Sequence, residues 1–293
     1  MGTALARALA LKGYEIEAMV ARHKERARRA AELAGARQAL ALTHRQLSKI
    51  PASDILLITT PDDAIESTAV QLAAHFKESA TRGGVRLKRA PTALHASGAL
   101  SSEVLQALSD AGFATGSMHP LLSVSDAVHG ADRFASAFFC IEGDDRAKRV
   151  ARSLVGALGA KSFSIKATDK ALYHAAAVMA SGHVTALFDI AIEMLARCGL
   201  RKERARQVLL PLLRSALENL YSNDPAQALT GTFARADADT VRKHLNSLRS
   251  SGLRDALAAY TLLGRRSLQL ARKGGSKAAA LKEIARALDE AGE

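Results

Sequence analysis

The sequence changes character near residue 166, and this change constrains the fold more than any single motif does. Before it, short apolar runs that predict β-strands alternate with segments of helical periodicity. Continuous apolar runs such as DILLITT (54–60) are typical of parallel strands that are covered on both faces. After it, every segment predicts a helix. We therefore expect an α/β domain with a Rossmann-like, mostly parallel sheet over 1–166, followed by an all-α domain over 167–293.

The alternation predicts individual elements. The expected strands are 14–21, 54–60, 90–95, 114–118, 136–141 and 161–165. The expected helices are 2–12, 25–34, 63–76, 101–110 and 145–157 in the first domain, and 169–198, 202–221, 239–249, 253–273 and 276–291 in the second. We expect Pro211 to kink the second C-terminal helix, because proline removes a backbone donor there.

Composition narrows the class of protein. The chain has 293 residues, of which 48% are hydrophobic and 24% charged, as in globular proteins. Aromatic residues make up only 4% and tryptophan is absent, which argues against a single-stranded nucleic-acid binder and leaves nucleic acid a weak third possibility. The net charge of +12 either attracts phosphates or reflects solvated basic helix faces, and composition leaves both open.

Cysteine usage and the N-terminus favour the cytoplasm. Cys140 and Cys198 lie far apart, without a CxxC pair or metal-ligand spacing, so we interpret both as small buried side chains in a reducing compartment. No metal site is predicted. We recognise no secretory signal, and we expect no apolar run to be long enough to span a bilayer.

The first residues fit part of a nucleotide-binding motif. A helix is expected to begin at Gly2, with Thr3 next to it, although dinucleotide folds first place a strand and G-x-G-x-x-G. Gly2 fits the last glycine of that motif, and 14–21 then fits the second strand. Either the start codon was placed at an internal methionine or the protein has lost its pyrophosphate cradle; we favour the misplaced start.

The end of the second expected strand indicates which cofactor would bind. The strand ends in Arg22, His23 and Lys24, with no acidic residue where NAD sites place one to bind the ribose. Arg22 offers a planar fork to a 2′-phosphate, which favours NADP. A solvated basic helix start is the alternative. The turn at Thr60 and Pro61 follows another parallel strand, at the sheet edge where ligands of such folds bind.

The sequence then shows a family resemblance. Seven segments carry it: GTALARAL, VARHKERA, LLITTPDDAI, LHASGALSSEVL, GSMHPLLSV (116–124), KALYHAAAVMASGHVTALF (170–188) and ALTGTFARADADTVRKHL (228–245). These segments resemble the pyrroline-5-carboxylate reductase and ketopantoate reductase superfamily. They look most like its Rossmann-like members with a C-terminal helical domain of unknown function. The resemblance implies an NADP-binding domain, a helical dimerisation domain that makes a homodimer, and an oxidoreductase role without a settled substrate.

The chain departs from that family pattern at three positions besides the missing first strand. The loop written L-T-G-P and R-G-D in the family has Thr232 in place of proline and Ala236 in place of glycine, and Gly182 stands where an asparagine is expected. These changes put contacts to a substrate in doubt.

Hydride transfer needs a proton donor or a polarising group beside the reacting carbonyl or imine. His95 and His119 end successive strands, and the loop after His119 carries Ser123 and Ser125. On the apolar helix 169–198, His174 and Ser181 share a polar stripe that must face a cleft or a partner. Each histidine could instead be a hydrogen-bonded structural residue. Tyr173 lies on a neighbouring stripe of the same helix.

These considerations give the predicted site and function. We predict an NADP-dependent oxidoreductase that acts on a small carbonyl or imine substrate; the alternative is a catalytically inactive nucleotide-sensing or scaffolding protein. The predicted catalytic residues are His119, His174 and Ser181, and the predicted cofactor-binding residues are Gly2, Thr3, Arg22, His23, Thr60, Pro61, His95 and Ser97.

Overall fold

The structure is a computed structural model that describes residues 1–81, 91–124 and 126–292. The chain forms two compact units, Met1–Met179 and Ala180–Glu293. The helical region that we expected to begin the second domain at residue 167 therefore starts within the first unit. Its first helix is held there by contacts to the sheet, which are given below.

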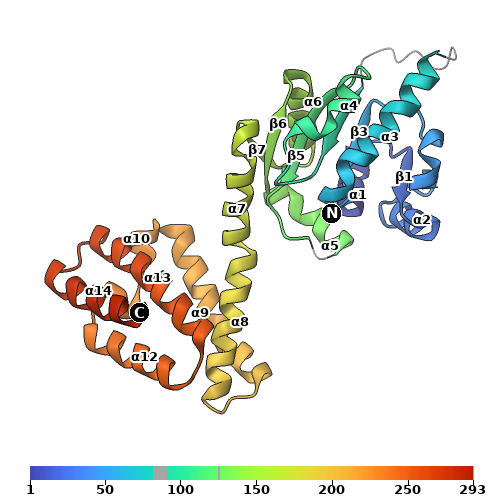
Figure 1. The fold of residues 1–293 in the computed structure, drawn as a ribbon. Helices are drawn as coiled ribbons and strands as arrows, with labels where there is room; N and C mark the ends of the chain where they lie inside the picture. The colour runs from blue at the N-terminus through green and yellow to red at the C-terminus, as the bar shows by residue number, and fades with distance from the viewer. Residues whose placement is uncertain (82–90, 125, 293) are drawn as a thin grey trace. The chain divides into compact units, whose positions relative to one another are not determined.

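The first unit is built on two sheets (Figure 1). One pairs β1 with β2 in parallel, and the other has the order β3-β4-β5-β6-β7. Strands β3, β4 and β5 are parallel, as are β6 and β7, whereas β5 and β6 are antiparallel. The mostly parallel, Rossmann-like sheet is thus confirmed. The strands are β1 Ala18–Ala21, β2 Leu40–Thr43, β3 Ile55–Ile58, β4 Thr92–His95, β5 Ala114–Pro120, β6 Phe138–Gly143 and β7 Lys161–Ser164.

Helices cover both faces of the larger sheet, because successive strand residues point to opposite sides. Leu94 packs into one apolar cluster with α1 and α6, whereas its neighbour Ala93 packs into another with α3 and α4. The helices of this unit, with short 3-10 turns labelled η, are α1 Gly2–Ala10, α2 Lys24–Leu33, η1 His44–Lys49, α3 Asp62–Thr81, η2 Ser102–Leu105, α4 Gln106–Ser109, α5 Ala127–Arg133, η3 Phe134–Ser136, α6 Asp145–Ala157, η4 Ala167–Asp169 and α7 Lys170–Ala180.

The second unit is entirely helical over its described residues. The expected helix 169–198 is interrupted at Ser181, which separates α7 from α8, and α9 continues through Pro211. Helices α12, α13 and α14 share an apolar core that includes the buried Ile284 and Leu288. The helices are α8 Gly182–Arg197, α9 Lys202–Ser222, α10 Pro225–Ala228, α11 Gly231–Ala234, α12 Ala238–Ser250, α13 Arg254–Lys273 and α14 Ala278–Gly292.

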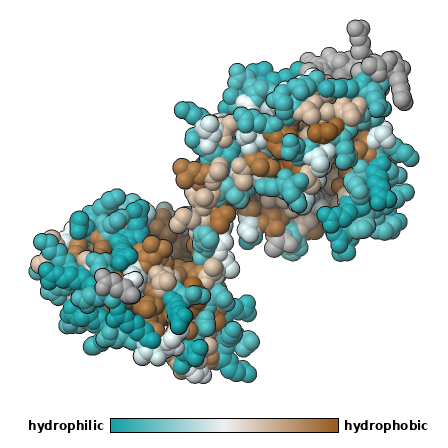
Figure 2. Space-filling model, in the orientation of Figure 1, coloured by the Kyte–Doolittle hydropathy of each residue, from teal (hydrophilic) through white to brown (hydrophobic). Residues whose placement is uncertain are grey.

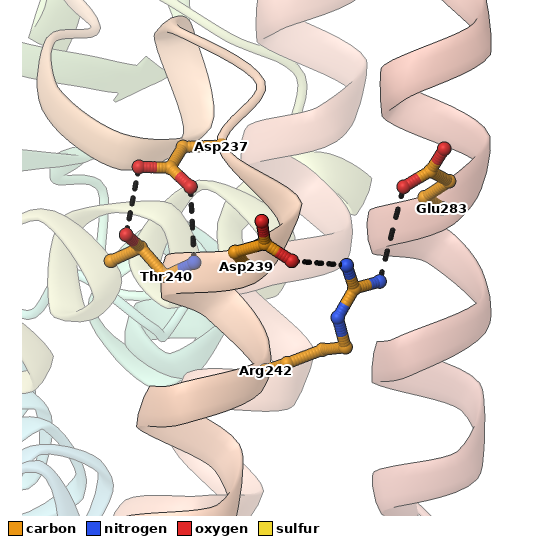
Figure 3. A network of polar contacts seen from close by, with 5 residues as sticks. All are labelled: Asp237, Asp239, Thr240, Arg242 and Glu283. Carbon is orange, nitrogen blue, oxygen red and sulfur yellow. Dashed lines mark hydrogen bonds and ion pairs between the residues drawn. The ribbon is translucent and has the colours of Figure 1, made fainter.

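Polar side chains fix the start of α12 (Figure 3). One carboxylate oxygen of Asp237 accepts a hydrogen bond from the Thr240 backbone N–H at 3.0 Å, and the other accepts from the Thr240 hydroxyl at 2.7 Å. Asp237 is therefore the N-cap residue of α12. Arg242, one turn later, pairs with Asp239 at 2.5 Å and reaches Glu283 of α14 at 3.9 Å. The first turns of α12 are thereby tied to α14.

One stretch corrects the expectation about membrane-spanning segments. By length and composition alone, Ala167–Arg197 is apolar enough to cross a membrane, and none of its most apolar window is buried. The expectation considered uninterrupted apolar runs, whereas the average hydropathy over this stretch is high although polar residues interrupt it. Hydrophobic residues also lie on the surface of the second unit (Figure 2), including Leu212 on α9, which is 68% exposed.

Candidate active site at the carboxyl ends of the strands

Gly2 lies against the carboxyl end of β3. A Cβ atom on Gly2 would stand 2.2 Å from the Thr59 hydroxyl oxygen and 3.1 Å from the Thr59 Cβ. Only glycine lets the start of α1 approach the strand this closely without displacing Thr59. This is the packing role that the last glycine of a dinucleotide-binding motif has.

The amino end of α1 can accept an anion. Neither a side-chain cap nor an acidic residue occupies its first turn. The free backbone N–H groups and the helix dipole at such an end favour a phosphate. Thr3 lies in this turn, and Thr60 and Pro61 follow directly after Thr59, where both are exposed. These residues fit one side of a diphosphate site.

Arg22 and His23 are exposed and lie directly after the carboxyl end of β1. His23 is the N-cap residue of α2, but its side chain makes no capping hydrogen bond. The Arg22 guanidinium is in none of the ion pairs found among the described residues. The positively charged Arg22 guanidinium therefore lies at the strand end where a 2′-phosphate binds in NADP sites.

His95, by contrast, is engaged on both sides of its ring. Its Nδ1 accepts from the Ser97 backbone N–H at 3.2 Å, and its Nε2 lies 3.1 Å from the Ser101 carbonyl oxygen. The side chain is 1% exposed, and burial lowers its pKa to about 4, with the Lys170 charge adding to the effect. These contacts favour the structural interpretation of His95, as the residue that shapes the loop after β4.

Ser97 organises the same loop. Its hydroxyl donates to Asp62 at 2.8 Å and accepts from the backbone N–H groups of Ala99 and Leu100 at 3.1 and 3.0 Å. Asp62 is the first residue of α3, so Ser97 joins the loops that follow β3 and β4. Its hydroxyl is saturated by these contacts, and its role toward a cofactor stays a prediction.

Lys170 is a buried charge that the sequence did not single out. It is 1% exposed, and its ammonium donates hydrogen bonds to the Ser97 carbonyl oxygen and the Ser117 hydroxyl, both at 3.0 Å. Burial lowers the pKa of Lys170, while Cys140, Glu142 and Asp62 oppose this effect. The lysine therefore holds α7 against the carboxyl ends of β4 and β5.

One turn further along α7, Tyr173 contacts His119. The tyrosine hydroxyl oxygen lies 2.6 Å from Nδ1 of His119, and the two rings meet edge to face. Tyr173 also hydrogen bonds to the buried Cys140, and burial raises the pKa of Tyr173 well above its ordinary value. The phenol is accordingly neutral over the physiological range.

The other nitrogen atom of His119 points toward Gly98. A Cβ atom on Gly98 would lie 2.9 Å from Nε2 of His119 and 2.4 Å from Nδ1 of His174. Nδ1 of His174 is buried and has no hydrogen-bond partner among the described residues. Because Gly98 has no side chain, Nε2 of His119 and Nδ1 of His174 both lie close to its backbone.

The charge state of His119 follows from its surroundings. Burial lowers its pKa to about 4, the positive charge of Lys170 and the neighbouring His174 add to this, and Asp62 opposes it. The imidazole is therefore neutral at pH 7, when it can donate one hydrogen bond and accept another.

The structure brings some predicted catalytic residues together and not others. His119 and His174 are neighbours, with ring centres 5.8 Å apart. Ser181 belongs to the second unit, at the start of α8, and Ser125 lies outside the described residues. In the part of the chain that the structure covers, no group of three or more histidine, cysteine or acidic side chains could hold a metal ion.

Lys170, Tyr173 and Gly98 were not among the predicted site residues. One signal could have identified Lys170: a lysine placed four residues before His174 on an otherwise apolar helix needs a buried partner. The contact between Tyr173 and His119 joins residues 54 positions apart, and no local pattern indicates it.

Comparison with known proteins agrees with this geometry. Residues 137–267 match the family described as "Domain of unknown function (DUF2520)". This confirms the predicted resemblance. The match includes β6, α7 and the loop before α12. No curated protein has a matching sequence.

Solved structures share the fold over nearly the whole chain. A Thermotoga maritima protein is 21% identical with a TM-score of 0.66, covering 87% of this chain and 90% of its own. A Bacteroides fragilis protein described as an NADP oxidoreductase is 20% identical with a TM-score of 0.63, covering 93% of both chains. A Coxiella burnetii pyrroline-5-carboxylate reductase is 15% identical with a TM-score of 0.53, covering 94% and 95%. The fold is that of NADP oxidoreductases and reductases.

Proposed function

We propose that the protein is an NADP-dependent oxidoreductase that acts on a small carbonyl or imine compound. The close approach of Gly2 to Thr59 carries the proposal, because it places an uncapped helix start at the carboxyl edge of a parallel strand. The neutral His119 beside Gly98 supplies a polar group at the next strand ends along the same sheet. A reduced nicotinamide bound along this edge would supply a hydride.

Different residues of this chain would bind different parts of the cofactor. Backbone N–H groups at Gly2 and Thr3 would bind the diphosphate, and Arg22 with His23 would bind the 2′-phosphate. Thr60 and Pro61 would line the same edge after β3.

The sheet order supports one further part of this proposal. The orders β2-β1 and β3-β4-β5 become one continuous parallel sheet if a single strand lies between β1 and β3, which is the arrangement of dinucleotide-binding folds. We expect NADPH to bind at the carboxyl edge of these parallel strands.

Arg22 provides the sharpest test of cofactor choice. Arg22→Ala should weaken NADPH binding about tenfold or more, because it removes charge-assisted hydrogen bonds to a phosphate. NADH binding should not change, since NADH lacks that phosphate. Fluorescence titration of both nucleotides measures this. Arg37→Ala, an exposed arginine on the loop before β2, is the control.

Two results would reject the proposal. Equal losses for NADPH and NADH would mean that Arg22 does not contact the 2′-phosphate. Absence of binding by either nucleotide to the unsubstituted protein would remove the oxidoreductase assignment itself.

We also propose that a second copy of the chain covers exposed apolar residues of the helical unit. Val208, Leu212 and Leu220 on α9 are 48%, 68% and 50% exposed and follow one another at spacings of four and eight, which places them along one side of the helix. Exposed stripes of this kind mark interfaces with protein or lipid.

A protein partner fits better than a bilayer. The apolar stretch Ala167–Arg197 includes Lys170, whose ammonium is bound to Ser97 and Ser117, so its first part is docked on the sheet. Sedimentation velocity should give a dimer, and Leu212→Glu should give a monomer. The exposed Leu11→Glu on the first unit is the control and should remain dimeric. A monomeric unsubstituted chain would contradict the proposal.

A further inference from the structure

The contact between Tyr173 and His119 determines where the imidazole carries its proton. At 2.6 Å, the tyrosine hydroxyl and Nδ1 of His119 share a short hydrogen bond that needs one hydrogen atom between them. A phenol O–H is a stronger donor than the N–H of a neutral imidazole, and an imidazole nitrogen is a stronger acceptor than a phenol oxygen, so Tyr173 donates its proton to Nδ1 of His119.

This arrangement leaves the proton of the neutral imidazole on Nε2. That atom faces Gly98, on the side opposite Tyr173. An N–H group fixed in this direction donates a hydrogen bond and cannot accept one. A ligand beside Gly98 must therefore bring a lone pair to Nε2.

We propose that Tyr173 is a positioning residue, that it fixes the proton of His119 on Nε2, and that this N–H binds the oxygen atom of a carbonyl substrate rather than the nitrogen atom of an imine. The substrate part rests on the proposed function; the tautomer part does not. A carbonyl oxygen has lone pairs and gains negative charge as a hydride reaches its carbon, so the bond strengthens as reaction proceeds.

An imine fits the same atom poorly. Its reducible form is the iminium ion, whose nitrogen carries a hydrogen atom and has no lone pair for Nε2. The positive charge of Lys170, which already lowers the pKa of His119, would also disfavour a cation at this place. The unpartnered Nδ1 of His174 provides a second polar atom on the other side of Gly98.

The chain contains its own control for this contact. In the second unit, the Tyr260 hydroxyl lies 2.8 Å from Nδ1 of His244, and these rings also meet edge to face. Tyr260→Phe removes the same kind of hydrogen bond as Tyr173→Phe, but far along the chain from His119.

Nitrogen-15 NMR of the histidine-labelled full chain tests the tautomer, with His119→Gln assigning the signal. The unsubstituted protein should show the His119 proton on Nε2, and Tyr173→Phe should give a mixture with Nδ1 protonated. Tyr260→Phe should change only His244. A proton on Nδ1 in the unsubstituted protein, or an unchanged tautomer in Tyr173→Phe, would overturn the positioning role.

Turnover by the full chain tests the substrate class, with NADPH and two probe sets: small 2-oxo acids such as pyruvate, and the cyclic imine 1-pyrroline. Carbonyl probes should react and the imine should not. Tyr173→Phe should lower kcat about 10- to 100-fold with KM little changed, less than the full loss of such a donor costs. Turnover of the imine alone would overturn the substrate assignment. Failure of NADPH to bind would reject the proposed function, and the NMR result would still decide the role of Tyr173.

Discussion

The Lys170 ammonium donates a hydrogen bond to the Ser117 hydroxyl and thereby ties helix α7 to strand β5. The same ammonium binds the Ser97 carbonyl oxygen in the loop after β4. One side chain thus fixes the relative positions of the elements that carry His119, Tyr173 and Gly98.

We expect Lys170→Met to lower the free energy of unfolding of the first unit by about 2–3 kcal/mol, because it leaves the buried oxygen atoms of Ser97 and Ser117 without a donor. Urea unfolding followed by circular dichroism measures this. Lys166→Met, at an exposed position one turn earlier, should change it little. Equal effects of the two substitutions would show that the buried bonds contribute nothing.

The contact between Gly2 and Thr59 can be tested with a double substitution. Gly2→Ala should destabilise the first unit by about 1–3 kcal/mol, since the new Cβ meets the Thr59 hydroxyl. Thr59→Ala removes that oxygen atom, so the double variant should regain much of the loss. Additive losses in thermal unfolding would mean that the two residues are not coupled.

Stability should depend on the protonation of His95. Its pKa is lowered from 6.5 to about 4 by burial, so between these values the unfolded chain binds a proton that the folded chain does not. The free energy of unfolding should therefore fall as pH drops from 6.5 to 4, by about 3 kcal/mol for this residue.

Urea unfolding at a series of pH values measures that slope. His95→Gln should reduce the slope and leave the part that comes from His119, whose pKa is also lowered to about 4, and His44→Gln, at an exposed position, should leave it unchanged. A slope that is the same in His95→Gln as in the unsubstituted protein would contradict the contribution of His95.

The loop before α12 holds Ala236 at a φ of +53°, and no other non-glycine residue among those described has a positive φ. Ala236→Gly should raise the free energy of unfolding of the helical unit by about 1 kcal/mol, because glycine adopts this conformation without steric cost. Ala234→Gly, within α11, should have the opposite sign. Differential scanning calorimetry distinguishes the two outcomes.

Local patterns predicted the regular parts of the fold. The alternation of strands and helices and the helix at 145–157 each follow from a few neighbouring residues, and the structure confirms them. Strand β2 was missed because LALT is too short to be distinguished from a loop. The antiparallel direction of β6 was not predicted either, since strand periodicity is the same in both directions.

The site was harder to predict than the fold. His119 and His174 were identified because histidines at strand ends and on apolar helices are conspicuous. Lys170 was missed because its partners, Ser97 and Ser117, lie 73 and 53 residues away in the sequence. Contacts of this kind depend on how the strands are ordered, and a single sequence does not encode that order in any local pattern.

The separation of β1–β2 from β3–β7 has a practical consequence for preparing the protein. Within the described residues, β1 pairs with β2 alone and β3 with β4 alone, so each leaves a row of backbone donors and acceptors without a neighbouring strand. Such edges recruit extended segments of other molecules. Concentrated solutions of residues 1–293 should therefore be prone to intermolecular β-pairing, and a short apolar peptide added in trans should suppress it.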